Sequence, residues 1–321
     1  MSNTTRIIDN NDYNTIRDRI IAVMGNGNVN PDTGFSDATF GYGQTVISSL
    51  INDDEVITKE QWDALRFDIL NARIHQDGTT PSIVEPIRGQ AIRYGSASPN
   101  NQYDLQTTTA ITNRLNVGVG QFIVEAASDL SETSVSPITR STSWNSVLTC
   151  SITTTFNDED HLRYFFNSGG KIRFSSSRSG GAATLQNSNW SELLNSIGTI
   201  DFAVTGSVNF YNLTSSFQTL ISRSSSGYYV GNNFSIQVRK PFAISPQVEF
   251  LVQWTDNYID RYPATPPFDV VDGVLELEVN EVRASGTLLP LAADAVRLGI
   301  PTPGNFSIVR PTFVVSSISG S

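Results

Sequence analysis

The second half of the chain alternates apolar and polar residues with a period of two, and this pattern constrains the fold more than any other feature. In the stretch SVLTCSITTTF (146–156), one series of alternate positions holds Leu148, Cys150, Ile152, Thr154 and Phe156. The positions between them hold Val147 and small polar residues. In an extended chain, successive side chains point to opposite faces, so this stretch predicts a half-buried β-strand.

Further strand candidates follow at short intervals, with turn residues between them. They are 170–177, 199–212, 216–224, 228–240, 247–257, 273–286 and 305–317. Within the fourth, VGNNF (230–234) predicts a hairpin turn, because Gly and Asn tolerate the positive φ of tight turns. One helix interrupts the series at SNWSELLNSIG, with Ser188 as its expected cap and Gly198 as its stop. Many short strands separated by turns indicate an antiparallel sandwich.

Helical spacing replaces this alternation in the first eighty residues. The segment NDYNTIRDRIIAVMGNG has Asp12 as a candidate N-cap, Gly25 as a stop and one apolar stripe: Tyr13, Ile16, Ile20 and Met24. In the segment ITKEQWDALRFDILNARIHQDG, Thr58 and Gln61 have the spacing of a capping box. An apolar series follows at helical intervals up to Gly78: Trp62, Leu65, Ile69 and Ala72. Both segments predict amphipathic helices.

These patterns predict a chain of the α+β class that is mainly β. A small helical head (residues 1–80) precedes a connecting segment (81–140) with a short helix near 105–118. An antiparallel sandwich-like domain with a few short helices occupies residues 141–321. No repeat of fixed period is found in the sequence.

Composition excludes several classes of partner. Charged residues make up 16% of the chain and the net charge is −10, whereas sequence-independent nucleic-acid binding needs a cationic face. Cys150 is the single cysteine, so an internal disulfide and a thiolate metal site are excluded. The N-terminal sequence lacks a secretory signal pattern, and no apolar stretch approaches the ~20 residues of a membrane span. We therefore expect folding in a cytoplasm, without nucleic acid or membrane insertion.

The stretch DEDHLRYFFNSGGKIRFSSSRSGG (158–181) admits both a chemical and a structural interpretation. In the structural one, Asn157 or Asp158 caps a helix whose apolar face contains Leu162, Phe165 and Phe166. Acidic residues in the first turn complement the helix dipole. The pair Gly169 and Gly170 then supplies a left-handed stop before a strand. We favour this interpretation because it gives every residue of the motif a structural role.

The chemical alternatives for this stretch fit less well. His161 with Asp158 and Asp160 offers metal ligands, but a helical site repeats its ligands at i and i+4, and position 165 is Phe. The glycine pair lacks the GxxxxGK[ST] spacing of a phosphate-binding loop. The other histidine, His75, lies near the end of a predicted helix, where a cation suits the dipole.

No other segment has a distinct catalytic or metal-binding pattern. There is no GxSxG elbow, and Asp53, Asp54 and Glu55 lie in an acidic turn that favours solvation. Residues 26–34 alternate oxygen-bearing side chains as a calcium loop does, but the closing bidentate Glu is missing, which favours an Asx-rich turn. We expect no catalytic residue, no metal and no cofactor.

Aromatic residues of the β-rich half form a candidate sugar-binding set, since aromatic rings stack on sugars. The set comprises Tyr228, Tyr229, Trp254, Tyr258 and Tyr262. The alternative is that these side chains belong to the core or to an interface, as strand aromatics commonly do.

Two segments resemble known proteins. YNTIRDRIIAVMGNG…FGYGQTVISS…ITKEQWDALRFDILNARIHQDG and FNDEDHLRYFFNSGGKIRFSSSRSGG resemble virion structural proteins of T-even-like phages that infect marine cyanobacteria. The resemblance implies a component of the tail, neck, baseplate or an attached fibre, located in the virion after assembly in the host cytoplasm. It implies no catalytic motif. The expected partners are further copies of the chain and other virion proteins.

Three functions compete on these grounds. The first is a non-enzymatic, homo-oligomeric virion component, in which the helical head contacts a neighbouring subunit through Trp62, Phe67, Phe40 and Tyr42. The same four residues equally suit packing within one chain. The second is an adhesin-like module that binds host-surface glycan through the β-rich half. The third is a hydrolase that acts on a host surface polymer.

Overall fold

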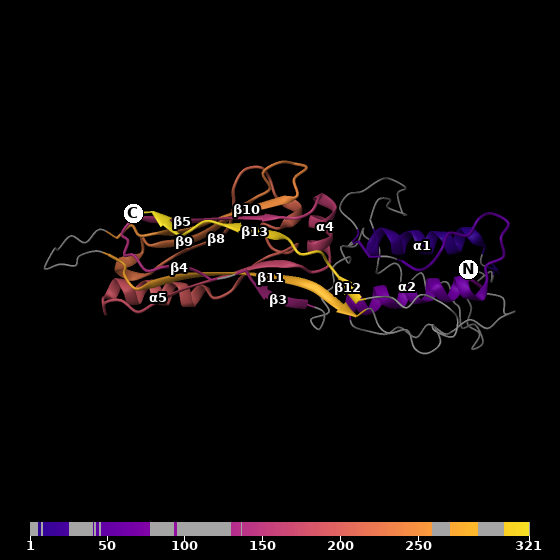
Figure 1. The fold of residues 1–321 in the computed structure, drawn as a ribbon, viewed down its shortest axis with the longest axis horizontal. Coiled ribbons are helices and arrows are strands. Elements are labelled where there is room, and N and C mark those ends of the chain that lie inside the picture. The colour runs from indigo at the N-terminus through magenta and orange to yellow at the C-terminus, as the bar shows by residue number, and fades with distance from the viewer. Residues whose placement is uncertain are drawn as a thin grey trace, which may run out of the picture. The chain divides into compact units, whose positions relative to one another are not determined.

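The computed structural model describes residues 6–7, 9–25, 41, 43–44, 46–77, 93–94, 130–135, 137–258, 270–287 and 305–320. The fold is α+β and mostly antiparallel strands in two facing sheets, with helices in the N-terminal part, as the sequence predicts (Figure 1). The chain divides into two compact units. Unit 1 comprises Met1–Ser131, Arg163–Gly169 and Ala284–Ile308, and unit 2 comprises Glu132–Leu162, Gly170–Arg283 and Val309–Ser321.

Unit 1 contains the two long helices, α1 (Asn10–Met24) and α2 (Lys59–Asp77), and a small sheet of β1 (Arg6–Ile7) and β2 (Arg93–Tyr94). The two helices meet through one residue of each predicted apolar stripe, because the Tyr13 and Trp62 rings lie 6.0 Å apart. The buried Asp68 carboxylate accepts hydrogen bonds from the backbone N–H groups of Ile47 (3.0 Å) and Ser48 (2.8 Å). These bonds hold the segment before α2 against the helix.

The start of α1 differs from the prediction. The N-cap is Asp9, which has extended backbone, and the predicted cap Asp12 is the third helical residue. Their side chains and backbone N–H groups form reciprocal hydrogen bonds of 3.0 and 3.2 Å. An acidic residue suits both positions of a capping box, so the sequence alone misplaced the cap by three residues.

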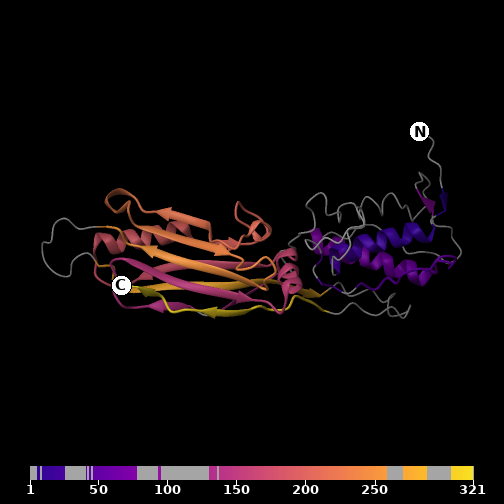
Figure 2. The same cartoon turned by 90° about the horizontal axis from the view of Figure 1, so that it is seen from above.

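Unit 2 holds the sandwich except for residues 130–131 and 284–307 of its strands and connections, which belong to unit 1. Its first sheet has the order β13-β5-β10-β9-β8, with β14 also paired to β5. The strands are β5 (Val147–Thr155), β8 (Gln218–Ser224), β9 (Asn233–Arg239), β10 (Gln247–Thr255), β13 (Thr312–Val315) and β14 (Ser319–Gly320). At its centre, β5 and β10 pair along their whole length. Figure 2 shows the antiparallel arrows of the sandwich from above.

The second sheet is built on the long strand β11 (Val274–Thr287), to which β3, β4, β6 and β12 all pair, while β7 pairs with β6. These strands are β3 (Leu130–Ser134), β4 (Ile138–Arg140), β6 (Lys171–Ser179), β7 (Ile200–Phe202) and β12 (Asn305–Ser307). Aromatic rings join the facing sheets, because Phe250 of β10 lies 4.9 Å from Phe174 and 5.4 Å from Phe202. The core of unit 2 therefore lies between the sheets.

Short helices lie between the strands along the chain. They are α4 (Glu159–Asn167), α5 (Leu185–Ile197) and the single-turn helices η3 (Phe210–Asn212) and η4 (Gly227–Tyr229). Helix α5 is capped by Thr184, whose side chain accepts from the Asn187 N–H, and not by the predicted Ser188. Ser188 lies in the first turn and its hydroxyl donates to the Thr184 carbonyl. The predicted stop, Gly198, has a φ of 64° and ends the helix.

Several strand boundaries depart from the prediction. The expected strand 199–212 ends at Phe202, because Gly206 turns the chain at a φ of 108° and Asn209 caps η3. The expected strand 305–317 is two strands, β12 in one sheet and β13 in the other, and the chain crosses between them at Pro311, which lacks an N–H. Strands β3 and β4 were not predicted. The expected helix at 105–118 lies outside the described residues.

Candidate functional site

The motif at 158–181 forms a capped helix followed by a strand. The Asp158 carboxylate accepts from the His161 backbone N–H at 2.8 Å, and the same oxygen lies 2.7 Å from the His161 ring Nδ1. These hydrogen bonds, first the backbone one, lower the pKa of Asp158. The carboxylate thus stabilises the first turn of α4, and it is more than half exposed.

The other members of the motif lie at the helix end and in the interior. Leu162, Phe165 and Phe166 are fully buried. Gly169 has a φ of 88° and its N–H donates to the Phe166 carbonyl at 3.1 Å, which closes the helix. The prediction that Gly170 shares this left-handed conformation is wrong, since its φ is not positive. One left-handed residue suffices to end a helix, and Gly170 already leads into β6.

The acidic and histidine residues of the described part of the chain form no group of three or more that could hold a metal ion. At the acidic turn, the Asn52 side chain and backbone N–H donate to Glu55 and lower its pKa. The loop 26–34, considered for calcium, and the His75 side chain lie outside the described residues. No described helix is long and apolar enough to span a membrane.

The predicted capping box of α2 has both of its hydrogen bonds. The Thr58 N–H donates to Gln61 Oε1 at 2.8 Å, and the Gln61 N–H donates to Thr58 Oγ1 at 3.2 Å. The proposed interface residues Trp62 and Phe67 are only 3% and 7% exposed, so the single chain already buries them. Phe40 and Tyr42 lie outside the described residues.

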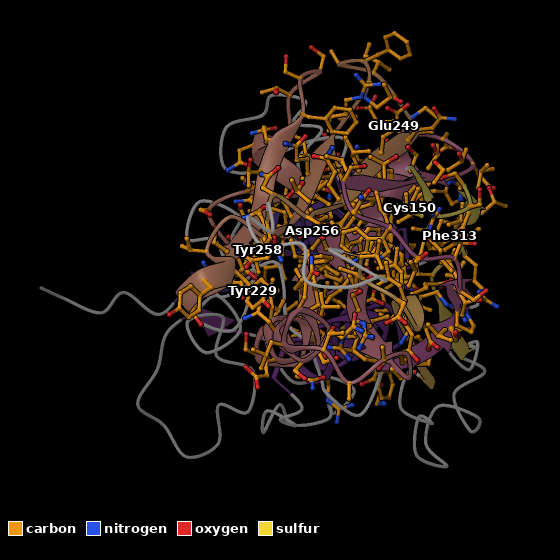
Figure 3. All side chains as sticks on the ribbon, turned by 90° about the vertical axis from the view of Figure 1, so that its left-hand side faces the viewer. Cys150, Tyr229, Glu249, Asp256, Tyr258 and Phe313 are labelled. Atoms are coloured by element: carbon orange, nitrogen blue, oxygen red, sulfur yellow. The ribbon has the colours of Figure 1, made fainter. Side chains whose placement is uncertain are left out.

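The aromatic residues considered for sugar binding separate into core and surface. Trp254 is fully buried, and its ring N–H donates to Ser176 Oγ at 3.2 Å. Tyr228 is 89% exposed in η4, and the neighbouring Tyr229 ring lies 4.5 Å from that of Tyr258 (Figure 3). The fifth residue, Tyr262, lies outside the described residues. Tyr228 therefore presents its ring to solvent, and Trp254 does not.

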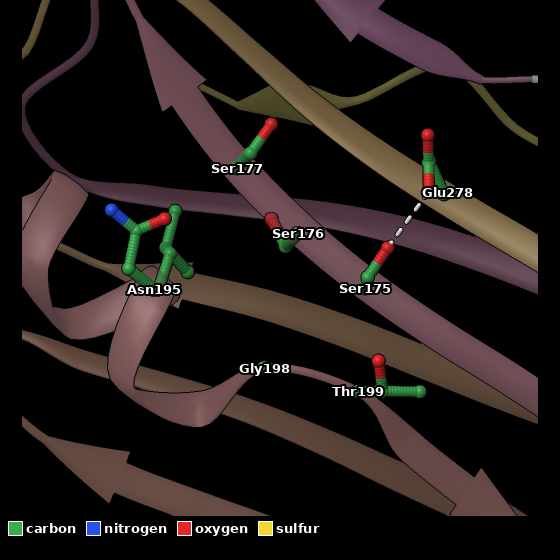
Figure 4. A pocket seen from close by; sticks show the side chains of 8 residues that line it. Ser175, Ser176, Ser177, Asn195, Gly198, Thr199 and Glu278 are labelled. Carbon is green, nitrogen blue, oxygen red and sulfur yellow. Dashed lines mark hydrogen bonds between the residues drawn. The ribbon is translucent and has the colours of Figure 1, made fainter.

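A polar pocket of about 320 Å³ lies beside β6, where α5 ends and β7 begins (Figure 4). Its lining is rich in hydroxyl groups: Ser175, Ser176, Ser177 and Thr199, with Asn195, Leu194, Gly198 and Glu278. The Glu278 carboxylate accepts from the Ser175 hydroxyl at 3.0 Å. It is the single titratable group among the described lining residues, so no described acid–base pair faces the pocket.

Two neighbouring loops of unit 2 expose large apolar side chains. We call this the loop surface and define it by Tyr211 and Phe217, which lie between β7 and β8, and by Phe242 and Ile244, which lie between β9 and β10. Phe242 is 70% and Ile244 is 83% exposed, and both other side chains are 38% exposed. The Lys240 N–H donates to the Thr214 carbonyl at 3.0 Å, which joins the two loops.

Sequence patterns alone do not predict this surface, because residues 199–212 have the pattern of a strand and residues 241–246 match no helix or strand pattern. Turn residues indicate loops in both stretches. They are Gly206 and Asn209 in the first, and the prolines at the two ends of PFAISP (241–246) in the second.

Comparisons with known proteins assign no family to this chain: no family model, no curated protein and no solved structure matches it.

Proposed function

We propose that the chain is a non-enzymatic structural component of a tailed-phage virion, in the tail, neck, baseplate or an attached fibre. It acts through homo-oligomeric assembly and through contacts with other virion proteins. The resemblance of residues 13–78 and 156–181 to virion proteins of T-even-like cyanophages suggests this class. No nucleic acid, membrane insertion, metal or cofactor is part of the proposal.

The observation that carries the proposal is the loop surface on a two-sheet sandwich. Exposed apolar patches on soluble proteins mark sites of protein–protein contact. The sandwich beneath it has a core of fully buried aromatic rings, including Phe174, Phe202 and Trp254. Such a core holds surface loops in place without disulfides, which suits a protein that assembles in a reducing compartment.

The test is whether the chain enters particles. Tailed particles are purified on a density gradient from an infected culture that produces this chain, and they are digested for quantitative mass spectrometry. The proposal predicts that peptides of the chain co-purify with capsid and tail proteins in a fixed ratio. A chain found only in the soluble lysate contradicts the proposal.

A second candidate function is glycan binding, favoured by the exposed ring of Tyr228 next to the Tyr229–Tyr258 pair. A glycan array probed with the wild-type chain and with Tyr228→Ala tests it. Binding that Tyr228→Ala abolishes supports an adhesin, whereas no signal above background for the wild type removes it. Trp254→Ala is no control here, because Trp254 belongs to the core.

A further inference from the structure

The loop surface lies in a part of the chain that carries no charge. Residues 202–222 and 241–248 contain no Asp, Glu, Lys or Arg, although the whole chain has 31 acidic and 21 basic residues. The two loops that form the surface fall inside these stretches and stand beside each other above the sheet, near β10 in Figure 1.

The charges that border the loop surface are paired. Arg239 Nε lies 2.6 Å from Glu249 Oε2, and Lys240 Nζ lies 2.6 Å from Glu159 Oε1. The Arg239 guanidinium also stacks 4.4 Å from the centre of the Phe217 ring. Both of these cations are therefore matched by a carboxylate, which leaves this part of the rim close to neutral.

Hydrogen bonds within the loop between β7 and β8 hold that loop in place, and the Lys240–Thr214 bond ties the start of the second loop to it. The Thr214 N–H donates to Gln218 Oε1 at 2.7 Å, and the Gln218 side chain donates to the Asn212 carbonyl at 3.1 Å. The Asn212 side chain donates in turn to the Ser207 carbonyl at 2.8 Å. A surface that is ordered before contact loses less conformational entropy when a partner binds.

We propose that the loop surface is the contact between copies of this chain. Two copies each carry a net charge of −10, so most ways of bringing them together place like charges near one another. A charge-free apolar surface with a neutral rim avoids that repulsion and removes apolar area from water. A strongly basic partner would gain no new ion pair with Glu159 or Glu249, because both bordering carboxylates already pair with cations of this chain.

This inference rests on the proposed function, because it names the surface through which the proposed homo-oligomer forms. The test compares the wild-type chain with the double variant Phe242→Ser, Ile244→Ser by light scattering and sedimentation across a concentration series. Tyr228→Ser is the matched control, since it also removes an exposed large side chain but lies outside the loop surface. Far-UV circular dichroism and melting curves verify that all variants keep the fold.

The expected result is that the wild type and Tyr228→Ser form the same oligomer. The double variant then dissociates, with a dissociation constant raised about a hundredfold or more, as for loss of central contact residues. A double variant that assembles like the wild type overturns the inference. So does a wild-type chain that stays monomeric at its highest soluble concentration.

Cysteine labelling gives a second readout that does not depend on destabilising the contact. Cys150 is the only natural cysteine and is fully buried, so Ile244→Cys and Tyr228→Cys each introduce one reactive thiol. Maleimide labelling of Ile244→Cys should slow as the protein concentration rises, because the contact between copies covers position 244. Labelling of Tyr228→Cys should not change with concentration. Equal and concentration-independent rates contradict the inference.

Failure of this inference and failure of the proposed function remain distinguishable. In one outcome, the wild-type chain is present in purified particles, and the double variant still oligomerises but no longer enters particles. The loop surface then contacts another virion protein. That outcome overturns the inference and leaves the proposed function intact. If the chain is absent from particles but the double variant dissociates, the surface assignment stands and the virion function fails.

Discussion

Replacement of Gly169 by valine tests the structural interpretation of the motif at 158–181. Gly169 has a φ of 88° and is buried, so the variant must either adopt a left-handed conformation or shift the chain. The left-handed conformation costs an L-residue about 1–2 kcal/mol, and a side chain forced into a packed site costs roughly a further 1–3 kcal/mol. The expected loss is therefore roughly 2–5 kcal/mol, a large part of the roughly 5–15 kcal/mol that stabilise ordinary domains.

The matched series uses other residues of the same motif. Gly169→Ala should lose less than Gly169→Val, because alanine is smaller and unbranched. Asp158→Ala removes the N-cap of α4 and should cost about 1 kcal/mol. His161→Ala removes a side chain that is 33% exposed and should stay within about 0.5 kcal/mol.

The assay is urea denaturation followed by tryptophan fluorescence and far-UV circular dichroism. Fluorescence reports on burial, since all four tryptophans are at most 3% exposed: Trp62, Trp144, Trp190 and Trp254. Where the two probes disagree, the units unfold separately and each transition is compared by itself. A Gly169→Val variant with the wild-type midpoint, together with loss of a hydrolytic activity in His161→Ala, would refute the structural interpretation.

Three further outcomes follow from buried or paired side chains. The thiol of Cys150, whose pKa burial raises, should resist maleimide in the folded chain and react once urea unfolds it; rapid labelling without denaturant would contradict its position. The hydrogen bonds from Arg173 lower the pKa of Asp201. The charged carboxylate therefore stabilises the fold fully above its unfolded pKa of about 4. This stabilisation is lost as the pH falls through the lower pKa of the folded state. Acid titration of Asp201→Asn, followed by circular dichroism, should accordingly show a smaller loss of stability below about pH 4 than the wild type. Trp254→Ala should destabilise unit 2 by about 3–5 kcal/mol in urea, and an unchanged midpoint would count against a core position.

The strands that the sequence predicts well are those with a long two-residue period. In β10, Val248, Phe250, Val252 and Trp254 share one parity, and all four are buried. The same parity would have placed Trp254 in the core and removed it from the candidate sugar-binding set. Strands β3 and β4 are short, and LSETS and ITR carry no such period, so their pairing to β11 is set by the tertiary structure.

The candidate sites were harder to predict because they depend on contacts between distant segments. The capping roles of Thr58, Gln61 and Asp158 follow from local spacing, and the expected hydrogen bonds are present. The loop surface requires Thr214 and Lys240 to meet, which no local pattern specifies. Exposure is likewise a tertiary property, so the sequence did not separate Phe242 from the buried phenylalanines.

Cryo-electron microscopy of intact tailed particles from cells that produce this chain decides whether it is a structural component of the virion. If it is, the density contains the two-sheet sandwich at a defined position in the tail, neck, baseplate or fibre, repeated by symmetry and with neighbouring copies in contact. Particles in which every ordered tail and neck density is accounted for by other chains would contradict it.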